Sequence, residues 1–116
     1  MKLYGIPNCD TVRKARAWLD QHAIALSFHD FRKQGVPAEL AQHWLEQLGW
    51  QQLINRKGLT WRALSQQRKD TIDNNLAALQ LMVEQPSIIR RPLLEQQGRV
   101  LHLGYDPASY AKIFNL

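Results

Sequence analysis

The single cysteine of the chain, Cys9, lies where the sequence changes from an apolar strand pattern to a helical pattern. Gly5 and Pro7 end the apolar run, and Asn8 precedes the cysteine at the expected helix start. A thiol at this position faces backbone N–H groups that lack an intrahelical partner, together with the positive end of the helix dipole. Both favour the thiolate over the thiol, so the position suits a nucleophilic cysteine.

The charged neighbours of Cys9 act in opposite directions on the thiol. Arg13 and Lys14 lie about one helical turn away and add positive potential. Asp10 directly follows the cysteine, where an acid suits a helix start but opposes a second negative charge. A buried structural thiol is the alternative interpretation, because a free cysteine is often buried without a chemical role.

Size and composition indicate a single domain, residues 1–116, that needs neither disulfide nor metal. The chain has 116 residues, of which 45% are hydrophobic, so it can bury a core unaided. One cysteine excludes an internal disulfide and any multi-cysteine metal site. No apolar run approaches the roughly 20 residues of a membrane span, and the N-terminus lacks the apolar core of a signal peptide. We therefore expect a cytoplasmic location, no membrane partner and, by default, a monomer.

The chain is moderately basic, with 15 lysines and arginines against 10 acids and a formal net charge of +5. This excess favours an anionic partner, such as a small anion, an acidic peptide or nucleic acid. The aromatic and basic motifs of RNA-binding modules are missing, so nucleic acid is not the expected partner.

Hydrophobic periodicity predicts the elements that position Cys9. Residues 2–6 are predicted as a strand, residues 9–22 as a helix and residues 24–29 as a second strand. A strand–helix–strand unit of this length makes its two strands parallel. Cys9 is therefore expected at the edge of a sheet, where the helix follows the first strand.

The middle of the chain, about residues 36–86, has helical patterns and lacks strand signals. Pro37 suits a first helical turn, Gly49 suits the end of a helix, and the polar stretch 50–73 suits short helical turns. Asp73 is predicted as the N-cap of a further helix. We interpret this part as a helical insertion between two halves of one small sheet.

The last part of the chain returns to strands. Residues 93–96 and 100–103 flank Gln97 and Gly98, a pair typical of a two-residue hairpin turn. Asp106, followed by a proline, suits the cap and first turn of a last helix. The order βαβ, helical block, ββα predicts an α/β fold with a mixed sheet.

Two motifs in this order resemble those of the arsenate reductase (ArsC) family. The first is YGIPNCDT at residues 4–11, which is similar to the active-site opening of the family and above all to its YffB-type branch. The second is IIRRP at residues 88–92, which resembles the Arg-Pro motif, while residues 103–105 resemble the closing strand. The resemblance covers essentially the whole chain and implies a thioredoxin-like fold with an all-helical insertion.

The resemblance also implies roles for individual residues. Cys9 would be the nucleophile, and Arg56 and Arg91 would help to hold an oxyanion and the thiolate. The Arg91–Pro92 peptide bond would be cis, with the proline facing the thiol. No resident cofactor or metal ion is expected, and glutathione is expected as co-substrate with a glutaredoxin as a further partner. The candidate anion-binding residues are Asn8, Arg13, Arg56 and Arg91.

Two departures from the family pattern bear on the substrate. A third oxyanion-binding arginine of arsenate reductases falls near Leu103, which is apolar, and Asp10 replaces the small residue usually found after the cysteine. Both departures disfavour a tetrahedral oxyanion. Spx-type regulators of the same family bind RNA polymerase and often sense redox through a Cys-x-x-Cys pair, whose second position is Val12 here.

The leading hypothesis is a glutathione-dependent thiol reductase, an oxidoreductase in which Cys9 forms a mixed adduct. The chain has no second cysteine, so an external thiol must resolve this adduct. Arsenate reduction by the same nucleophile, coupled to glutathione and glutaredoxin, is the alternative enzyme hypothesis. An Spx-like module that binds RNA polymerase is the alternative of another class.

Overall fold

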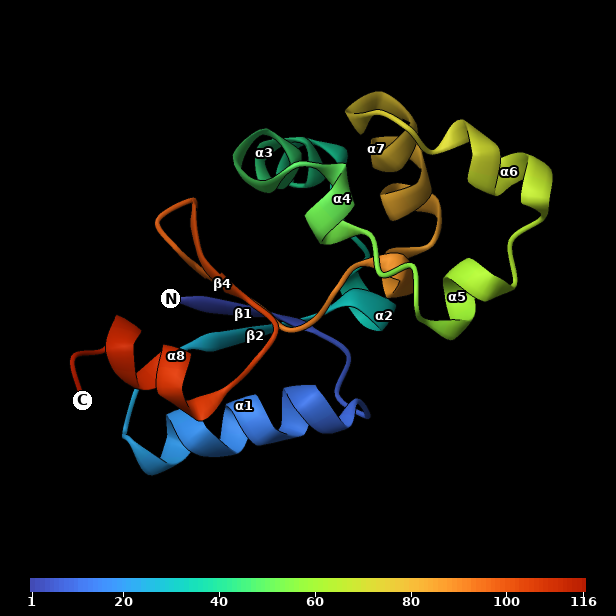
Figure 1. The fold of residues 1–116 in the computed structure, drawn as a ribbon. Helices are drawn as coiled ribbons and strands as arrows, with labels where there is room; N and C mark the ends of the chain where they lie inside the picture. The colour runs from blue at the N-terminus through green and yellow to red at the C-terminus, as the bar shows by residue number, and fades with distance from the viewer. The chain divides into compact units, whose positions relative to one another are not determined.

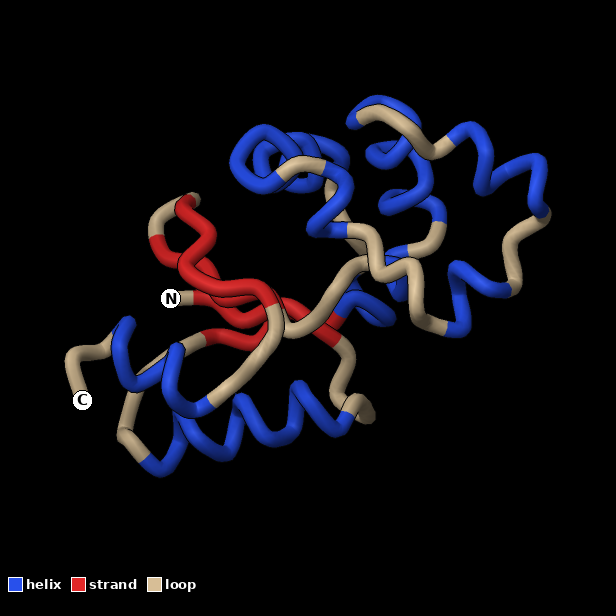
Figure 2. The backbone as a smooth tube through the Cα atoms, viewed as in Figure 1, coloured by secondary structure: helices blue, strands red, loops and turns tan.

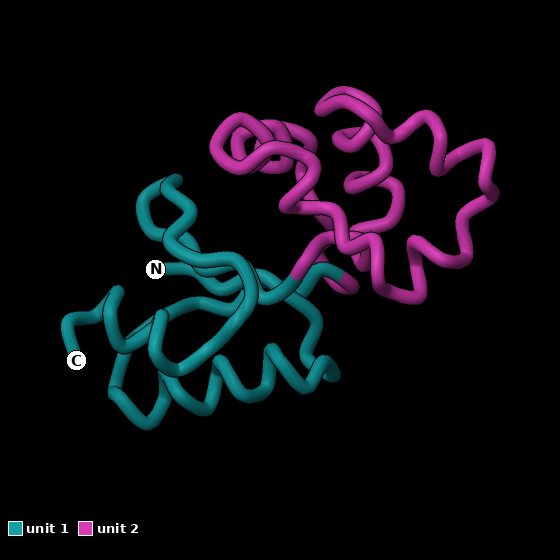
Figure 3. The backbone as a smooth tube through the Cα atoms, in the orientation of Figure 1, with its two compact units in different colours: residues 1–31, 91–116 teal, residues 32–90 magenta.

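The computed structural model describes residues 1–116, and its strands lie towards the two ends of the chain with helices between them (Figures 1 and 2). Residue contacts divide the chain into two compact units, residues 1–31 with 91–116 and residues 32–90 (Figure 3). The first unit carries the sheet, and the second is helical. None of the helices combines the length and the apolar character that crossing a membrane requires.

The first unit is built on a four-stranded sheet in the order β2-β1-β3-β4. The central strand β1 (Lys2–Gly5) pairs in parallel with β2 (Ser27–Asp30) and antiparallel with β3 (Leu93–Gln96). β3 in turn pairs antiparallel with β4 (Arg99–Leu103). The predicted α/β fold with a mixed sheet is confirmed, including the parallel pairing of the first two strands.

Two helices, α1 (Asp10–Gln21) and α8 (Pro107–Ile113), lie against one face of this sheet (Figure 1). Their buried side chains join those of the central strands in one core: Leu3, Ala15, Leu19, Leu94 and Tyr110. Burying a leucine side chain stabilises the fold by about 1.5–3 kcal/mol, so this core anchors α1 along its apolar side. Because only residues 6–9 join β1 to α1, the start of the helix is held near the end of the central strand.

The last hairpin and the last helix begin as the sequence predicts. Gln97 and Gly98 both have a positive φ, 51° and 79°, which is the combination of a type I′ turn. The side chain of Asp106 accepts a hydrogen bond from the Ser109 N–H at 2.8 Å and caps α8. Pro107 follows in the first turn, where its missing N–H leaves no helical bond unmade.

The start of β2 was predicted too early, because the end of α1 extends into that segment. Ala23 has a φ of 55° and donates its N–H to Asp20, while the Ile24 N–H donates to Leu19, both at 3.0 Å. These are the two hydrogen bonds of a Schellman motif, which ends a helix with one left-handed residue. Ile24 therefore belongs to the helix terminus, and the strand begins at Ser27.

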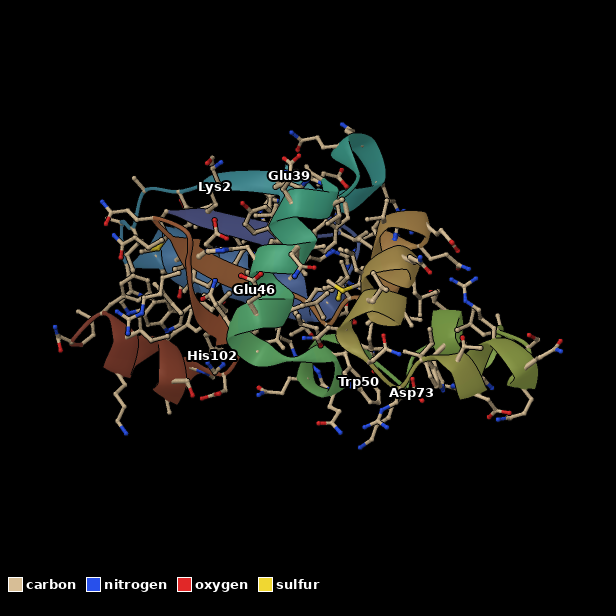
Figure 4. The ribbon with its side chains drawn as sticks, turned by 90° about the horizontal axis from the view of Figure 1, so that it is seen from above. Lys2, Glu39, Glu46, Trp50, Asp73 and His102 are labelled. Atoms are coloured by element: carbon tan, nitrogen blue, oxygen red, sulfur yellow. The ribbon has the colours of Figure 1, made fainter.

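The second unit is helical, as predicted. Its two longest helices, α3 (Ala38–Leu48) and α7 (Asn75–Glu84), pack against each other, and Trp44 is fully buried on α3. Glu39 and Glu46 lie seven residues apart on the exposed side of α3 (Figure 4). The shorter helices are α2 (Phe31–Gln34), whose first residue belongs to the first unit, α4 (Trp50–Leu53), α5 (Leu59–Arg62), α6 (Gln66–Thr71) and the 3₁₀ helix η1 (Pro86–Ile88).

The segment that follows η1 is tied to the end of α4 inside the second unit. Ile54 and Ile89 form an isolated antiparallel bridge, and the Arg90 N–H donates to the Leu53 carbonyl at 2.8 Å. The Arg90 side chain adds a bond from Nε to the Gln52 carbonyl at 3.1 Å. The backbone just before Arg91 is therefore fixed by hydrogen bonds within its own unit.

The N-cap of α7 is Asn74, so the prediction of Asp73 was wrong by one residue. Asn74 Oδ1 accepts a hydrogen bond from the Ala77 N–H at 2.9 Å, whereas Asp73 Oδ1 accepts one from the Asn74 side-chain amide at 2.7 Å. We expect Asn74→Ala to lower the free energy of unfolding by about 1 kcal/mol, as measured by urea denaturation. Asp73→Ala is the neighbouring control (Asp73 is labelled in Figure 4) and should change it much less. Equal losses in the two variants would contradict this assignment of the cap.

Candidate active site

Cys9 is the N-cap residue of α1. Its backbone is extended, with a φ of −94° and a ψ of 128°, and its carbonyl accepts a helical hydrogen bond from the Arg13 N–H at 2.9 Å. The turn before it is closed by the Cys9 N–H, which donates to the Ile6 carbonyl at 3.3 Å. The free thiol is partly buried. It therefore lies where a side chain meets the unpaired amides of the first helical turn, as the sequence predicts.

Two opposing effects act on the Cys9 thiol. Burial by itself raises the pKa of the thiol, because it disfavours the charged form. The backbone N–H groups of Val12 and Thr11 and the Arg91 guanidinium act against it, because they favour the thiolate, and the net pKa lies below the ordinary value of a cysteine.

Arg91 approaches Cys9 from the segment that leads into β3. The Arg91–Pro92 peptide bond is cis, as the family resemblance implies. The Pro92 carbonyl accepts a hydrogen bond from the Gly104 N–H at 2.8 Å, directly after β4. The segment that carries the guanidinium is therefore attached to the residue that follows β4, directly before β3 begins.

Gly5 lies beside the site, although the sequence pattern indicates it only as the end of a strand. A methyl group at this position would come within 2.9 Å of Val12 Cγ2 and 3.7 Å of Arg91 Cβ. Separations below about 3 Å force one of the neighbours to move. A glycine here therefore lets the first turn of α1 approach the end of β1, whereas Arg91 would lie at an ordinary contact distance.

The exposed side chains of Asp10 and Arg13 form an ion pair on the first turn of α1. Arg13 Nη1 donates to Asp10 Oδ1 at 2.8 Å, and the side chains are 59% exposed for Arg13 and 84% exposed for Asp10. The two residues were predicted as separate charges, although their spacing of three residues is that of neighbours on a helix. One nitrogen of the Arg13 guanidinium is therefore already hydrogen-bonded, and anion binding by Arg13 stays a prediction.

The other two candidate anion-binding residues are also exposed. Asn8 lies in the turn directly before Cys9. Arg56 belongs to the second unit, where its guanidinium carbon lies 5.5 Å from the centre of the Trp50 ring (Trp50 is labelled in Figure 4). In the same loop, Asn55 Oδ1 accepts a hydrogen bond from the Lys57 N–H at 3.1 Å. Binding of an anion by Asn8 or Arg56 stays a prediction.

Arg91→Gln should raise the pKa of Cys9, because it removes both a hydrogen-bond donor and a positive charge from beside the thiolate. The reaction rate with a disulfide rises as pH passes through this pKa, so the rise should move to higher pH in the variant. Thiolate absorbance and alkylation rate as functions of pH measure the change. Arg90→Gln is the matched control, since it removes the same charge one residue away, where the guanidinium binds the Gln52 carbonyl instead. Equal pKa values in Arg91→Gln and the unmodified chain would remove Arg91 from the site.

Comparison with known proteins is consistent with this geometry. The ArsC family model matches residues 4–113. The solved structure of a YffB protein is 43% identical, covers 97% of this chain and 96% of its own, and superposes with a TM-score of 0.90. An arsenate reductase (ArsC) related protein from Brucella melitensis is also 43% identical, with a TM-score of 0.78 over 99% of this chain and 94% of that protein. The global transcriptional regulator Spx of Lactiplantibacillus plantarum is 28% identical over 106 residues, which are 90% of this chain and 78% of the regulator.

These matches confirm the resemblance and the predicted thioredoxin-like α/β fold. At the level of the family, the arsenate reductase-related structures support an oxidoreductase that works through a thiol, while the Spx regulators are relatives with another kind of activity. The chain belongs to the ArsC family.

Proposed function

We propose that this chain is a glutathione-dependent thiol reductase with Cys9 as its only nucleophile. The observation that carries the proposal is the Cys9 thiol at the N-cap of α1, with the Arg91 guanidinium donating to its sulfur and a lowered pKa. Thiolates, not thiols, attack disulfide sulfur, so a lowered pKa increases the reactive fraction. Family membership supports an oxidoreductase of thiol type, and dependence on glutathione is what the proposal adds.

In the first step, the Cys9 thiolate attacks the glutathione sulfur of a mixed disulfide between glutathione and a substrate thiol. The S–S bond of the substrate breaks, a Cys9–glutathione disulfide forms, and the substrate leaves as a thiolate that takes a proton from solvent. A second glutathione thiolate then attacks the glutathione sulfur of this adduct, which releases the Cys9 thiolate and forms glutathione disulfide. In total, the mixed disulfide and one glutathione thiol are converted into the free substrate thiol and one glutathione disulfide, which joins the incoming glutathione to the glutathionyl group taken from the substrate.

An external thiol is required because Cys9 is the only cysteine of the chain. Glutathione suits this role, since it is an abundant thiol with carboxylates that arginine forks bind well. Arg91 serves both steps, because a lowered pKa makes Cys9 reactive in the first step and a good leaving group in the second. A glutaredoxin would be an alternative partner in the second step.

The similarity to Spx favours one second candidate, a module that binds RNA polymerase. A redox switch through a Cys-x-x-Cys pair needs a second thiol where this chain has Val12, whose side chain is fully buried. A pull-down with RNA polymerase beside a glutathione turnover assay separates the two classes. Polymerase binding without turnover would favour the regulator.

Exposure to oxidised glutathione should produce a mixed disulfide at Cys9, and reduced glutathione should remove it with turnover. Mass spectrometry of the intact protein detects the adduct. Turnover is measured with a mixed disulfide of glutathione and a small thiol as substrate and reduced glutathione as reductant, because glutathione reductase then detects the glutathione disulfide that the reaction forms. Cys9→Ser should lose both activities while its circular dichroism stays unchanged. Substantial turnover in the serine variant would exclude Cys9 as the nucleophile, and the absence of any adduct in the unmodified chain would exclude the proposed function.

Arsenate should be reduced poorly or not at all. Leu103 is the last residue of β4 and pairs with Leu93, and it stands where the family resemblance places a third oxyanion-binding arginine. Each charge-assisted hydrogen bond contributes about 1.5–3 kcal/mol, so the absence of this third guanidinium should weaken arsenate binding about ten- to a hundredfold. Leu103→Arg should gain arsenate affinity, as measured by calorimetry, whereas Leu116→Arg adds the same charge at an exposed terminal position and should not. Efficient arsenate reduction by the unmodified chain, coupled to glutathione and glutaredoxin, would make arsenate the preferred substrate.

A further inference from the structure

The ion pair of Asp10 and Arg13 has no part in the thiol exchange described above. Asp10 directly follows the nucleophile, and its carboxylate accepts a hydrogen bond from Arg13 Nη1 at 2.8 Å. An acid in this place repels a purely anionic partner as it approaches Cys9. A surface that served only to attract anions would be better without it, so the pair fits a partner that carries both charges.

Each member of the pair keeps hydrogen-bonding capacity towards solvent. Arg13 has five N–H donors, and an ionised carboxylate such as that of Asp10 accepts at about four lone-pair sites. Only one hydrogen bond joins the two side chains, and both are largely exposed. The first turn of α1 therefore presents a negative and a positive group side by side, next to the thiol. An α-amino acid head group, with its ammonium and carboxylate on one carbon, is the complementary arrangement.

We propose that Asp10 and Arg13 recognise the zwitterionic amino acid head of the thiol that reacts with Cys9. Asp10 accepts hydrogen bonds from the ammonium group, and Arg13 donates to the carboxylate. The partner class is therefore a thiol or disulfide with a free α-amino acid group, such as the γ-glutamyl end of glutathione. This inference rests on the proposed thiol chemistry of Cys9.

The dimensions and the strength of the contact suit such recognition. A helical turn rises about 5.4 Å, so Asp10 and Arg13 lie within about one turn of Cys9, at one and four residues from it. The γ-glutamyl head of glutathione is separated from its sulfur by several bonds, which lets the two ends bind at the same time. Exposed ion pairs change an equilibrium by up to about fivefold, so the preference is modest and weakens with added salt.

The test compares two disulfides as partners of Cys9, oxidised glutathione and its N-acetylated form. Acetylation removes the ammonium groups but leaves the cysteine sulfur and its surroundings unchanged. The unmodified chain should form the adduct about three- to fivefold faster with oxidised glutathione, as measured by mass spectrometry over time. Any change in the reactivity of Cys9 itself cancels in the ratio of the two rates.

Asp10→Asn keeps the size of the side chain but removes its charge, and it should bring the ratio close to one. Asp20→Asn makes the same change in net charge on the exposed side of α1, away from Cys9, and should keep the ratio of the unmodified chain. If the ratio of the two rates is the same in Asp10→Asn as in the unmodified chain, recognition of the head group is overturned, whereas the thiol chemistry of Cys9 is unaffected. No adduct with either disulfide would overturn the thiol chemistry of Cys9 and this inference with it.

Discussion

The chemistry of the chain depends on one balance, between the partial burial of the Cys9 thiol and the hydrogen-bond donors that surround it. Donors act more strongly on a charge in a partly buried place than in water, because the local dielectric constant is lower. Deeper burial would reverse the result, since the cost of removing the thiolate from water would exceed the gain from two amides and one guanidinium. The fold keeps the sulfur at an intermediate depth by placing it at the N-cap of α1, beyond the end of the central strand.

The elements that hold Cys9 were largely predictable, because each has a local chemical signal. The turn at Gln97 and Gly98 needs two residues with positive φ, and Asp106 supplies a capping oxygen at the position where α8 begins. The prediction was wrong where such signals are missing or ambiguous. Ala23 adopts a left-handed conformation without being glycine or asparagine, so the sequence did not indicate the Schellman motif that delays β2.

The other error in the predicted fold is the choice of Asp73 as the N-cap of α7, and it arises because two neighbouring side chains have similar chemistry. Asp73 and Asn74 both cap helices well, and the local sequence does not decide which oxygen faces the Ala77 N–H. In the candidate site, too, a residue with a local sequence signal was predicted from the sequence pattern, whereas a residue brought in from a distant part of the chain was not. Cys9 follows from the helix start, whereas Arg91 was implied only by family resemblance, because it is far from Cys9 in the sequence and is brought near it by the pairing of β1 with β3.

A chain with one cysteine must use the same sulfur first as attacking group and then as leaving group. These roles make different demands, because a lower pKa increases the thiolate fraction and improves departure but reduces the intrinsic nucleophilicity of the sulfur. A lowered pKa therefore has opposite effects on the two roles, and at Cys9 the lowering is the net result of burial, which raises the pKa, and of the nearby donors, which lower it. Little remains at the sulfur itself to distinguish one disulfide from another. Selectivity must then come from groups around the thiol, and the Asp10–Arg13 ion pair is the charged arrangement that the first turn of α1 places there.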